Sequence, residues 1–174
     1  MSCVAIPFYA CLPAVCEKLI LNGYTKVYEG WSTSSALFDT PVFLLCVELG
    51  IYWVHRALHA SPRLFGLFHA THHSYTPTGL TPFAGMAFQP LDGLFQGAPY
   101  LVAIFVRPIH AVVFEALMFA TGIWTAFIHL PNCGSLFRWV LGPAHHRAHH
   151  KRFNKNFGQY TVLCDYLFGT LCET

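Results

Sequence analysis

Long apolar runs alternate with short polar stretches along most of the chain. Four runs approach the roughly 20 residues that a helix needs to cross a bilayer, namely residues 3–21, 41–58, 91–106 and 109–130. The last two form a helical hairpin broken at Arg107 and Pro108, because proline removes a backbone donor and ends a helix. The third run is short for a full crossing, so we expect it to be tilted or re-entrant. The pattern predicts an all-α integral membrane protein with about four transmembrane or re-entrant helices.

The first apolar run carries Pro7 and Pro13 and lacks the basic start of a secretory signal, so we expect no cleavage there. We interpret residues 1–40 as an N-terminal membrane segment followed by a non-cytoplasmic loop. A fragment that lacks earlier residues of a longer protein is the alternative interpretation.

Composition favours lipid as the solvent of this chain. Hydrophobic residues make up 55% of the 174 positions and charged residues only 10%, and the mean hydropathy is +0.46. Disordered tails, coiled coils and nucleic-acid-binding proteins need far more charge than this, so these classes are excluded. The net charge is only +2, and the basic residues form no run, so no nucleic-acid partner is indicated.

The distribution of lysine and arginine predicts the orientation in the membrane. If successive helices cross and return, residues 56–90 and 129–174 share one face, and residues 22–40 and 107–110 share the other. The first face carries Arg56, Arg63, Arg138, Arg147, Lys151, Arg152 and Lys155. The second carries only Lys26 and Arg107, with Lys18 close by. Because positive charge stays cytoplasmic, the first face is expected in the cytoplasm, and it holds every histidine except His110.

Histidine is the unusual residue of this chain, since its 11 copies exceed the 10 lysines and arginines together. The sequence HRALH places His55 and His59 four residues apart near the end of a predicted helix, with their Cβ atoms about 6 Å apart. Two further boxes, HATHH and HRAHH, have offsets of three and four that gather rings on one helical face. They contribute His69, His72, His73, His146, His149 and His150. This pattern predicts a cytoplasmic helical cap that carries the histidine boxes.

A single histidine on an apolar face is usually a core or interface residue, but eight converging imidazoles would lack partners without a cation. Eight nitrogens exceed one tetrahedral site, so two metal ions are expected. Imidazole suits zinc, copper, iron and nickel alike. No acidic residue sits inside a box, as a hydrolytic zinc site would require, so metal-bound dioxygen chemistry on an apolar substrate fits better.

Three more residues are candidates around this site. His129 follows the fourth apolar run and returns to the cytoplasmic face, which makes it a ninth candidate ligand. His145 adjoins the last box and stands four residues before His149, in competition with His146 for a ligand role. Asp165 is a candidate acceptor for the far nitrogen of a ligating ring, with a helix-cap or surface role as its alternative.

The three boxes, the intervening TPFAGMAFQPLDG, the GIWTAFIH before residue 130 and the closing NFGQYTVLCDYLFGT together resemble the fatty acid hydroxylase/sterol desaturase superfamily. The resemblance covers residues 41–171, which it implies are a catalytic domain, and TPFAGMAFQPLDG is most similar to sterol C-5 desaturases. It implies an enzyme of the endoplasmic reticulum membrane with two iron ions, for which zinc can substitute on isolation. It also implies dioxygen as oxidant and electrons from NAD(P)H through a cytochrome b5-type donor.

The resemblance assigns the metal ligands to nine positions of this chain: His55, His59, His69, His72, His73, His129, His146, His149 and His150. Three positions depart from the sterol desaturase pattern. Gln89 stands where histidine precedes Pro-Leu-Asp-Gly, Cys133 stands where a second histidine follows His129 by four residues, and Gln159 stands where plant members have histidine. Gln89 is therefore expected near the ligands rather than among them, and Cys133 is not counted as a ligand, because a thiolate resists oxidising chemistry poorly.

The favoured function is a di-iron, dioxygen-dependent oxidoreductase that acts on a lipid C–H bond, with sterol C-5 desaturation ahead of fatty-acid or carotenoid hydroxylation. Two hypotheses from other classes stand beside it. One is a membrane protein that binds or transports metal ions, although transport sites usually lie near the bilayer midplane rather than at helix ends. The other is a non-catalytic scaffold, which Gln89, Cys133 and Gln159 suggest.

Overall fold

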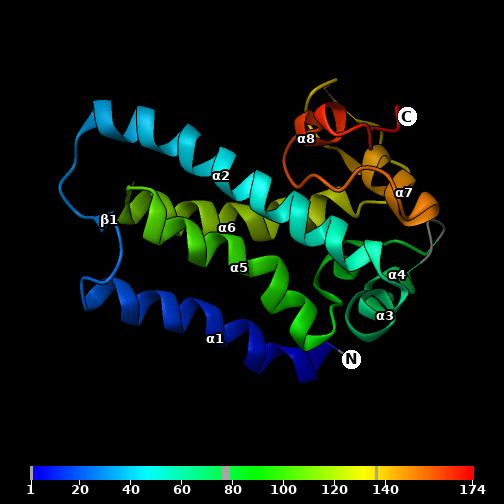
Figure 1. The fold of residues 1–174 in the computed structure, drawn as a ribbon, viewed down its shortest axis with the longest axis horizontal. Coiled ribbons are helices and arrows are strands. Elements are labelled where there is room, and N and C mark those ends of the chain that lie inside the picture. Colours follow the sequence, from blue (N-terminus) through cyan, green and yellow to red (C-terminus); the bar gives the residue numbers. More distant parts are fainter. Residues whose placement is uncertain (1, 76–78, 136) are drawn as a thin grey trace.

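The computed structural model describes residues 2–75, 79–135 and 137–174. Four long helices lie side by side along the molecule, and short helices cap one end of them (Figure 1). The long helices are α1 (Ser2–Leu21), α2 (Thr33–Ala60), α5 (Pro90–Val106) and α6 (Ala111–Ile128). The predicted mostly helical architecture is therefore confirmed, and each of the four apolar runs of the sequence corresponds to one of these helices.

The cap contains six short helical segments. They are α3 (Pro62–Leu64), the π-helix η1 (Phe65–His69), α4 (Ala70–His73), the 3-10 helix η2 (Pro82–Met86), α7 (Pro143–Arg152) and α8 (Leu163–Leu167). In Figure 1 they gather at the end of the molecule where α2 finishes. Helix α6 ends at the same end of the molecule. His55 and His59 of α2 therefore lie close to His129, which directly follows α6.

A two-stranded parallel pairing closes the opposite end. Strand β1 (Val27–Tyr28) pairs with β2 (Ile109–His110), with Val27 opposite Ile109 and Tyr28 opposite His110. The Nε2 of His110 contacts the backbone oxygen of Glu29 at 2.9 Å, and its Nδ1 accepts from the backbone N–H of Val112. His110 is thus a structural residue at the end away from the cap, apart from the other histidines.

Helix boundaries follow ordinary capping chemistry. Ser32 accepts a hydrogen bond from Ser35 N and starts α2 eight residues before the predicted 41–58, with Pro41 tolerated inside the helix. Arg107 and Pro108 separate α5 from α6, as predicted. The turn after α3 is a π-helix, and single π-turns of this kind often occur at functional sites.

The long helices expose apolar side chains that a protein in water would bury. A core that includes Phe43, Val47, Ile104 and Phe114 lies between them, yet large residues on their outer faces are exposed. These include Leu37, Phe38, Val102, Phe119 and Ile123. So many exposed large apolar side chains on the long helices favour an interaction with lipid or protein. Within the described residues, α2 and α6 are long and apolar enough to cross a membrane, and α5 is shorter.

Two buried carboxylates hold the loop at residues 157–161: Glu48 ties it to α2, and Asp165 ties it to α8. Glu48 of α2 accepts hydrogen bonds at 2.9–3.3 Å from the backbone N–H groups of Gln159, Tyr160 and Thr161, and from the Thr161 hydroxyl. Asp165 accepts from the backbone N–H groups of Phe157 and Gly158. The loop approaches both carboxylates closely, because a Cβ on Gly158 would lie 3.1 Å from Glu48 Oε1 and 3.2 Å from Asp165 Oδ2.

The first prediction concerns this attachment. Glu48→Gln replaces one acceptor oxygen with an N–H₂ group that faces backbone donors, so we expect a loss of about 2–4 kcal/mol of stability. The exposed Glu17→Gln serves as the control and should stay within about 0.5 kcal/mol of wild type. Thermal unfolding in detergent measures both. Equal stability of the two variants would contradict the role assigned to Glu48.

Candidate metal centre

The three histidine boxes and His129 meet inside the cap, although 95 residues of chain separate the first of them from the last. All nine candidate ligands fall into two groups, and within each group one ligand atom per residue lies within 4.8 Å of all the others. The first cluster is His55, His59, His69, His73 and His149. The second cluster is His72, His129, His146 and His150. The sequence therefore identified every histidine that the structure brings together.

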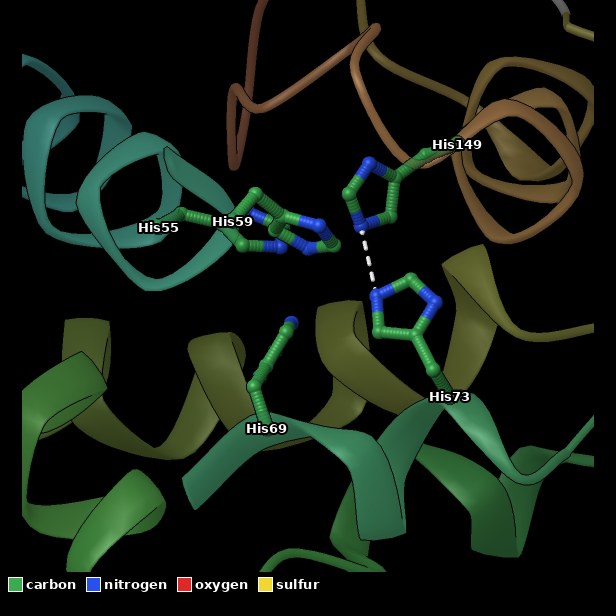
Figure 2. Close-up of side chains that lie close together, drawn as sticks. All are labelled: His55, His59, His69, His73 and His149. Carbon is green, nitrogen blue, oxygen red and sulfur yellow. Dashed lines mark hydrogen bonds between the residues drawn. The ribbon is translucent and has the colours of Figure 1, made fainter. Parts of the chain in front are cut away.

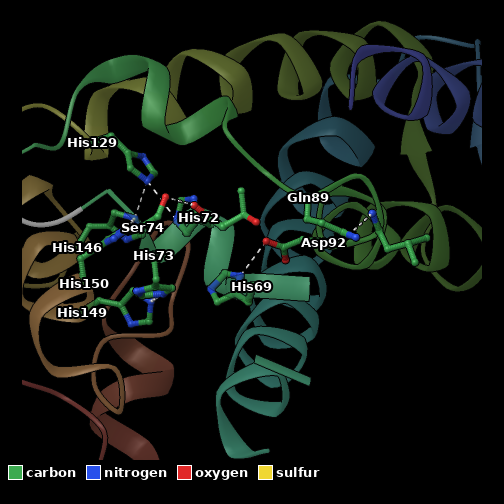
Figure 3. A network of polar contacts seen from close by, with 12 residues as sticks. His69, His72, His73, Ser74, Gln89, Asp92, His129, His146, His149 and His150 are labelled. Carbon is green, nitrogen blue, oxygen red and sulfur yellow. Dashed lines mark hydrogen bonds and ion pairs between the residues drawn. The ribbon is translucent and has the colours of Figure 1, made fainter. Parts of the chain in front are cut away.

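Each cluster draws on several elements. In the first cluster, α2 supplies His55 and His59, the η1–α4 segment supplies His69 and His73, and α7 supplies His149; Figure 2 shows the five rings pointing toward one another from these elements. In the second cluster, residues from α4 and α7 meet His129, which directly follows α6 (Figure 3).

The sequence expected each HxxHH box to present its rings on one face, but the structure divides each box between the clusters. His69 and His73 are four apart and enter the first cluster, while His72 between them turns to the second. The last box is divided in the opposite sense, because His146 and His150 enter the second cluster and His149 enters the first. Residues three and four apart share a face only approximately, and this angular difference is enough to serve two sites.

Hydrogen bonds to oxygen fix which ring nitrogen faces each cluster. The Nδ1 atoms of five rings contact oxygens at 2.6–3.2 Å: His55 with Phe157 O, His69 with Asp92 Oδ2, His129 with Thr125 O, His149 with Lys155 O and His150 with Tyr75 O. A carbonyl or carboxylate oxygen only accepts, so Nδ1 carries the proton in these rings. The lone pair is then on Nε2, which is the atom that faces the cluster.

The Nε2 atoms within each cluster approach one another at distances that fit a shared cation. The Nε2 of His146 lies 2.8 Å from that of His129 and 3.1 Å from that of His150. In the first cluster, the Nε2 atoms of His73 and His149 are 3.0 Å apart. Two nitrogens bound to one tetrahedral ion at about 2.1 Å lie about 3.4 Å apart. In each pair at least one ring, that of His129, His149 or His150, presents its lone pair, and one ion can bind both Nε2 atoms of a pair.

Three nitrogens of the first cluster supply an independent test of the fit. The Nε2 atoms of His55, His59 and His69 are buried and have no hydrogen-bond partner among the described residues. Buried polar atoms are nearly always satisfied in native proteins, so three orphans that converge on one point need an explanation. A metal ion bound by imidazole nitrogen satisfies all three, and the donor set therefore fits a metal in each cluster.

Burial keeps the rings outside the helical spans in the form that binds metal. Desolvation lowers the pKa of His129 to about 4 and that of His150 to about 3. The pKa values of the other cap histidines also fall below the usual range, first through burial and then through the charges of neighbouring histidines; these are His69, His72, His73, His146 and His149. All seven are therefore neutral at pH 7, and neutral imidazole is the ligand form.

Asp92 is a site residue that the sequence analysis missed. It follows Pro90 in the first turn of α5, is fully buried, and holds His69 Nδ1 at 2.8 Å (Figure 3). A carboxylate in this position orients the ring and raises the basicity of its other nitrogen. The signal that could have found Asp92 is its place in a short polar turn between two apolar segments, since a charged residue buried there needs a partner.

The three residues expected around the ligands occupy other positions. Both oxygens of Asp165 are taken by the cap loop and by the Thr170 hydroxyl, at 2.7–2.9 Å, so it supports His55 only indirectly, through the backbone of Phe157. His145 lies outside both clusters, and its Nδ1 contacts Ser135 Oγ and Gly142 N at the start of α7. Gln89 caps α5 by accepting from Leu91 N at 3.0 Å.

Comparison with known proteins agrees with this geometry. A sequence model of the family described as fatty acid hydroxylase matches residues 40–170. The chain belongs to the fatty acid hydroxylase family. That span includes all nine clustered histidines and Asp92, so the matched region of this family member contains the complete candidate metal centre.

Several curated relatives have specific names. The chain is 42% identical over 173 residues to a Delta(7)-sterol-C5(6)-desaturase of Nicotiana tabacum, with 96% of this chain and 63% of the relative covered. It is 38% identical over 168 residues to a Delta(7)-sterol 5(6)-desaturase of Candida dubliniensis, with 94% of this chain and 43% of the relative covered. It is 35% identical over 176 residues to human lathosterol oxidase, with 95% of this chain and 57% of the relative covered. The chain spans less than two thirds of the length of each of these relatives. No solved structure matches it.

The second prediction tests a ligand position of this fatty acid hydroxylase family member. His72→Ala removes one of four nitrogens from the second cluster, so we expect the metal content of the purified protein to fall by about one ion per chain. Elemental analysis measures the content, and membrane insertion should be unchanged. His110→Ala removes a histidine at the opposite end and should keep the full metal content. Undiminished metal in His72→Ala would contradict the ligand role.

The third prediction concerns Asp92. Asp92→Asn offers an N–H₂ donor to His69 Nδ1, which moves the ring proton to Nε2 and opposes metal binding there. Loss of such a supporting carboxylate typically weakens metal affinity about 10- to 100-fold. Competition with a chelator measures the affinity of each site. Asp39→Asn, which removes a carboxylate that pairs with Tyr28 outside the clusters, should leave both sites unaffected.

Proposed function

We propose that this chain is the catalytic part of a membrane-bound sterol C-5 desaturase, in which each histidine cluster holds one iron ion. The observation that carries the proposal is the convergence of nine buried imidazoles into two clusters where two apolar helices end. The sterol part rests on the names of relatives such as the tobacco Delta(7)-sterol-C5(6)-desaturase. Zinc can occupy the same nitrogens in isolated protein, since imidazole binds both metals.

The proposed reaction forms a double bond between C5 and C6 of a Δ7-sterol. One hydrogen atom leaves each carbon, and dioxygen accepts both, together with two electrons and two protons, and departs as two water molecules. Bound iron supplies the activation of dioxygen that no amino-acid side chain provides. Electrons would come from NAD(P)H through a cytochrome b5-type donor.

The chain's own residues hold and shield the reaction site. The five oxygen acceptors of the Nδ1 protons keep the Nε2 lone pairs aimed inward throughout the cycle. Eight of the nine clustered histidines are buried, so water is kept away from reactive species. A buried, nitrogen-only shell suits dioxygen chemistry on an apolar lipid better than hydrolysis, which needs a carboxylate base beside the metal.

We further propose that α1, α2, α5 and α6 lie in the endoplasmic reticulum membrane and that the cap faces the cytoplasm. The exposed Lys151 and Arg152 of α7 lie on the cap, and positive residues stay on the cytoplasmic side. The same charges suit an acidic electron donor, because complementary charge speeds and orients docking. In this arrangement residues 1–40 form the first membrane segment and a non-cytoplasmic loop, and residues 41–171 form the catalytic domain.

The fourth prediction tests the reaction in a host that lacks sterol C-5 desaturase. Expression of this chain should restore 5,6-unsaturated sterols in the lipid profile, while His72→Ala should leave the profile of the deficient host unchanged. His110→Ala should restore the sterols as wild type does. A hydroxylated lipid in place of the unsaturated sterol would instead identify a hydroxylase of the same family, and metal binding without any lipid product would favour a metal-binding protein or a scaffold.

A further inference from the structure

A cavity of about 170 Å³ lies beside the clusters, between α2, α5 and α6. Four of the clustered histidines form one part of its wall: His55, His72, His129 and His146. Gln159 and Thr125 also line it, and the Gln159 Nε2 donates to Thr125 Oγ1 at 3.2 Å. The carboxamide of Gln159 keeps a second N–H and its oxygen for other partners. The cavity therefore combines metal-binding rings with a hydrogen-bonding group suited to one small polar substituent.

A second space, a groove of about 550 Å³, runs along the outside of the bundle between α2 and α6. Leu44 and Leu45 of α2 line one side, and Leu117 and Trp124 of α6 line the other. Both helices are the candidate membrane spans, so the groove faces lipid in the proposed arrangement. Its apolar walls suit the hydrocarbon part of a membrane lipid.

The groove and the cavity meet at three hydroxyl groups, because Thr121 lines both spaces while Tyr100 lines the cavity and Tyr160 the groove. Thr121 donates to Leu117 O at 2.7 Å and therefore accepts from Tyr160 at 2.6 Å, and the Tyr160 hydroxyl also contacts that of Tyr100. These side chains stand between the lipid-facing groove and the cavity that the histidines line. Thr121, Tyr100 and Tyr160 thus form a partition between the two spaces. Gln159 lines the cavity on one side of it, and the next residue, Tyr160, lines the groove on the other.

Volume decides how a lipid can occupy the two spaces. Sites for ligands of drug size have volumes of about 300–1,000 Å³. The cavity, at about 170 Å³, admits only one end of a sterol, and the remainder must lie in the groove of about 550 Å³. The two spaces together therefore suit a ligand with a small polar end and a large apolar body.

This inference rests on the proposed reaction, whose chemistry determines which end of the sterol enters the cavity. The hydroxyl-bearing C3 of a sterol is separated from C5 by one carbon, so C5 reaches the metals only if the hydroxyl enters the cavity as well. A sterol in a bilayer already places its hydroxyl at the membrane surface, which is where the cap lies in the proposed arrangement. Entry from the membrane thus requires no inversion of the lipid.

We propose that the Tyr160 side chain turns away from Thr121 as the sterol binds hydroxyl-first: its 3-hydroxyl hydrogen-bonds to Gln159 beside Thr125 in the cavity, and its rings and side chain occupy the groove between α2 and α6. Gln159 is then a specificity-determining residue rather than a ligand of the metal. A buried hydrogen-bonding group left without its partner is costly, so the site should discriminate against sterols that lack a free hydroxyl.

The test combines an enzyme change with a substrate change. Wild type should desaturate a Δ7-sterol with at least about tenfold higher kcat/KM than its 3-methyl ether, and Gln159→Leu should reduce this ratio to within about threefold. Binding of the two radiolabelled sterols to the metal-free protein in detergent should show the same loss of discrimination. Unchanged metal content in Gln159→Leu establishes that the clusters are intact.

The groove is tested separately with two exposed alanines of α6. Ala120 lines the groove and Ala116 does not, so Ala120→Trp should raise KM at least about fivefold while Ala116→Trp leaves it near wild type. Discrimination that persists in Gln159→Leu, or equal KM values for the two tryptophan variants, would overturn the binding mode while leaving desaturation intact. If wild type produced no 5,6-unsaturated sterol, the proposed function itself would fail.

Discussion

The fixed orientation of the imidazole rings is the constraint on which the rest of this structure depends. A neutral imidazole has one lone pair, and a metal centre needs that lone pair on the inward nitrogen. Five oxygen acceptors from four separate regions of the chain hold the Nδ1 protons. They are the carboxylate of Asp92 and the backbone carbonyls of Tyr75, Thr125, Lys155 and Phe157, the last two from one loop. Assembly of the centre therefore requires that these loops and helix ends be placed correctly first.

Placement of the loop at 157–161 explains the two buried carboxylates. The Phe157 carbonyl holds His55, and the backbone N–H groups of the same loop are held by Glu48 and Asp165. Buried carboxylates are costly unless fully hydrogen-bonded, and each of these accepts at least three bonds. Since Glu48 lies in α2 two turns before His55, the same helix positions both a ligand and the loop that orients it.

The sequence was sufficient for the helices and for the set of clustered histidines, because apolar length and histidine spacing are local signals. It was insufficient for the division of each box, since His69, His72 and His73 lie too close in angle for spacing alone to separate them. The sequence analysis missed Asp92 because its partner His69 is 23 residues away in the chain and contacts it only when α5 packs beside η1. Asp165 was one candidate acceptor with a cap or surface role as its alternative, and nearby backbone N–H groups occupy its oxygens.

The location of the histidines argues for chemistry at one membrane surface rather than passage of ions across it. A transport path needs ligands at successive depths, commonly near the midplane. All eleven histidines are described; ten lie in the cap or where α2 and α6 reach it, and His110 at the opposite end is engaged with Glu29 and Val112. Between these ends the helices carry apolar residues and the partition at Thr121, which leads sideways to the groove. In the proposed arrangement the candidate metal centre therefore lies beside a groove that faces lipid, which is the side from which an apolar substrate would arrive.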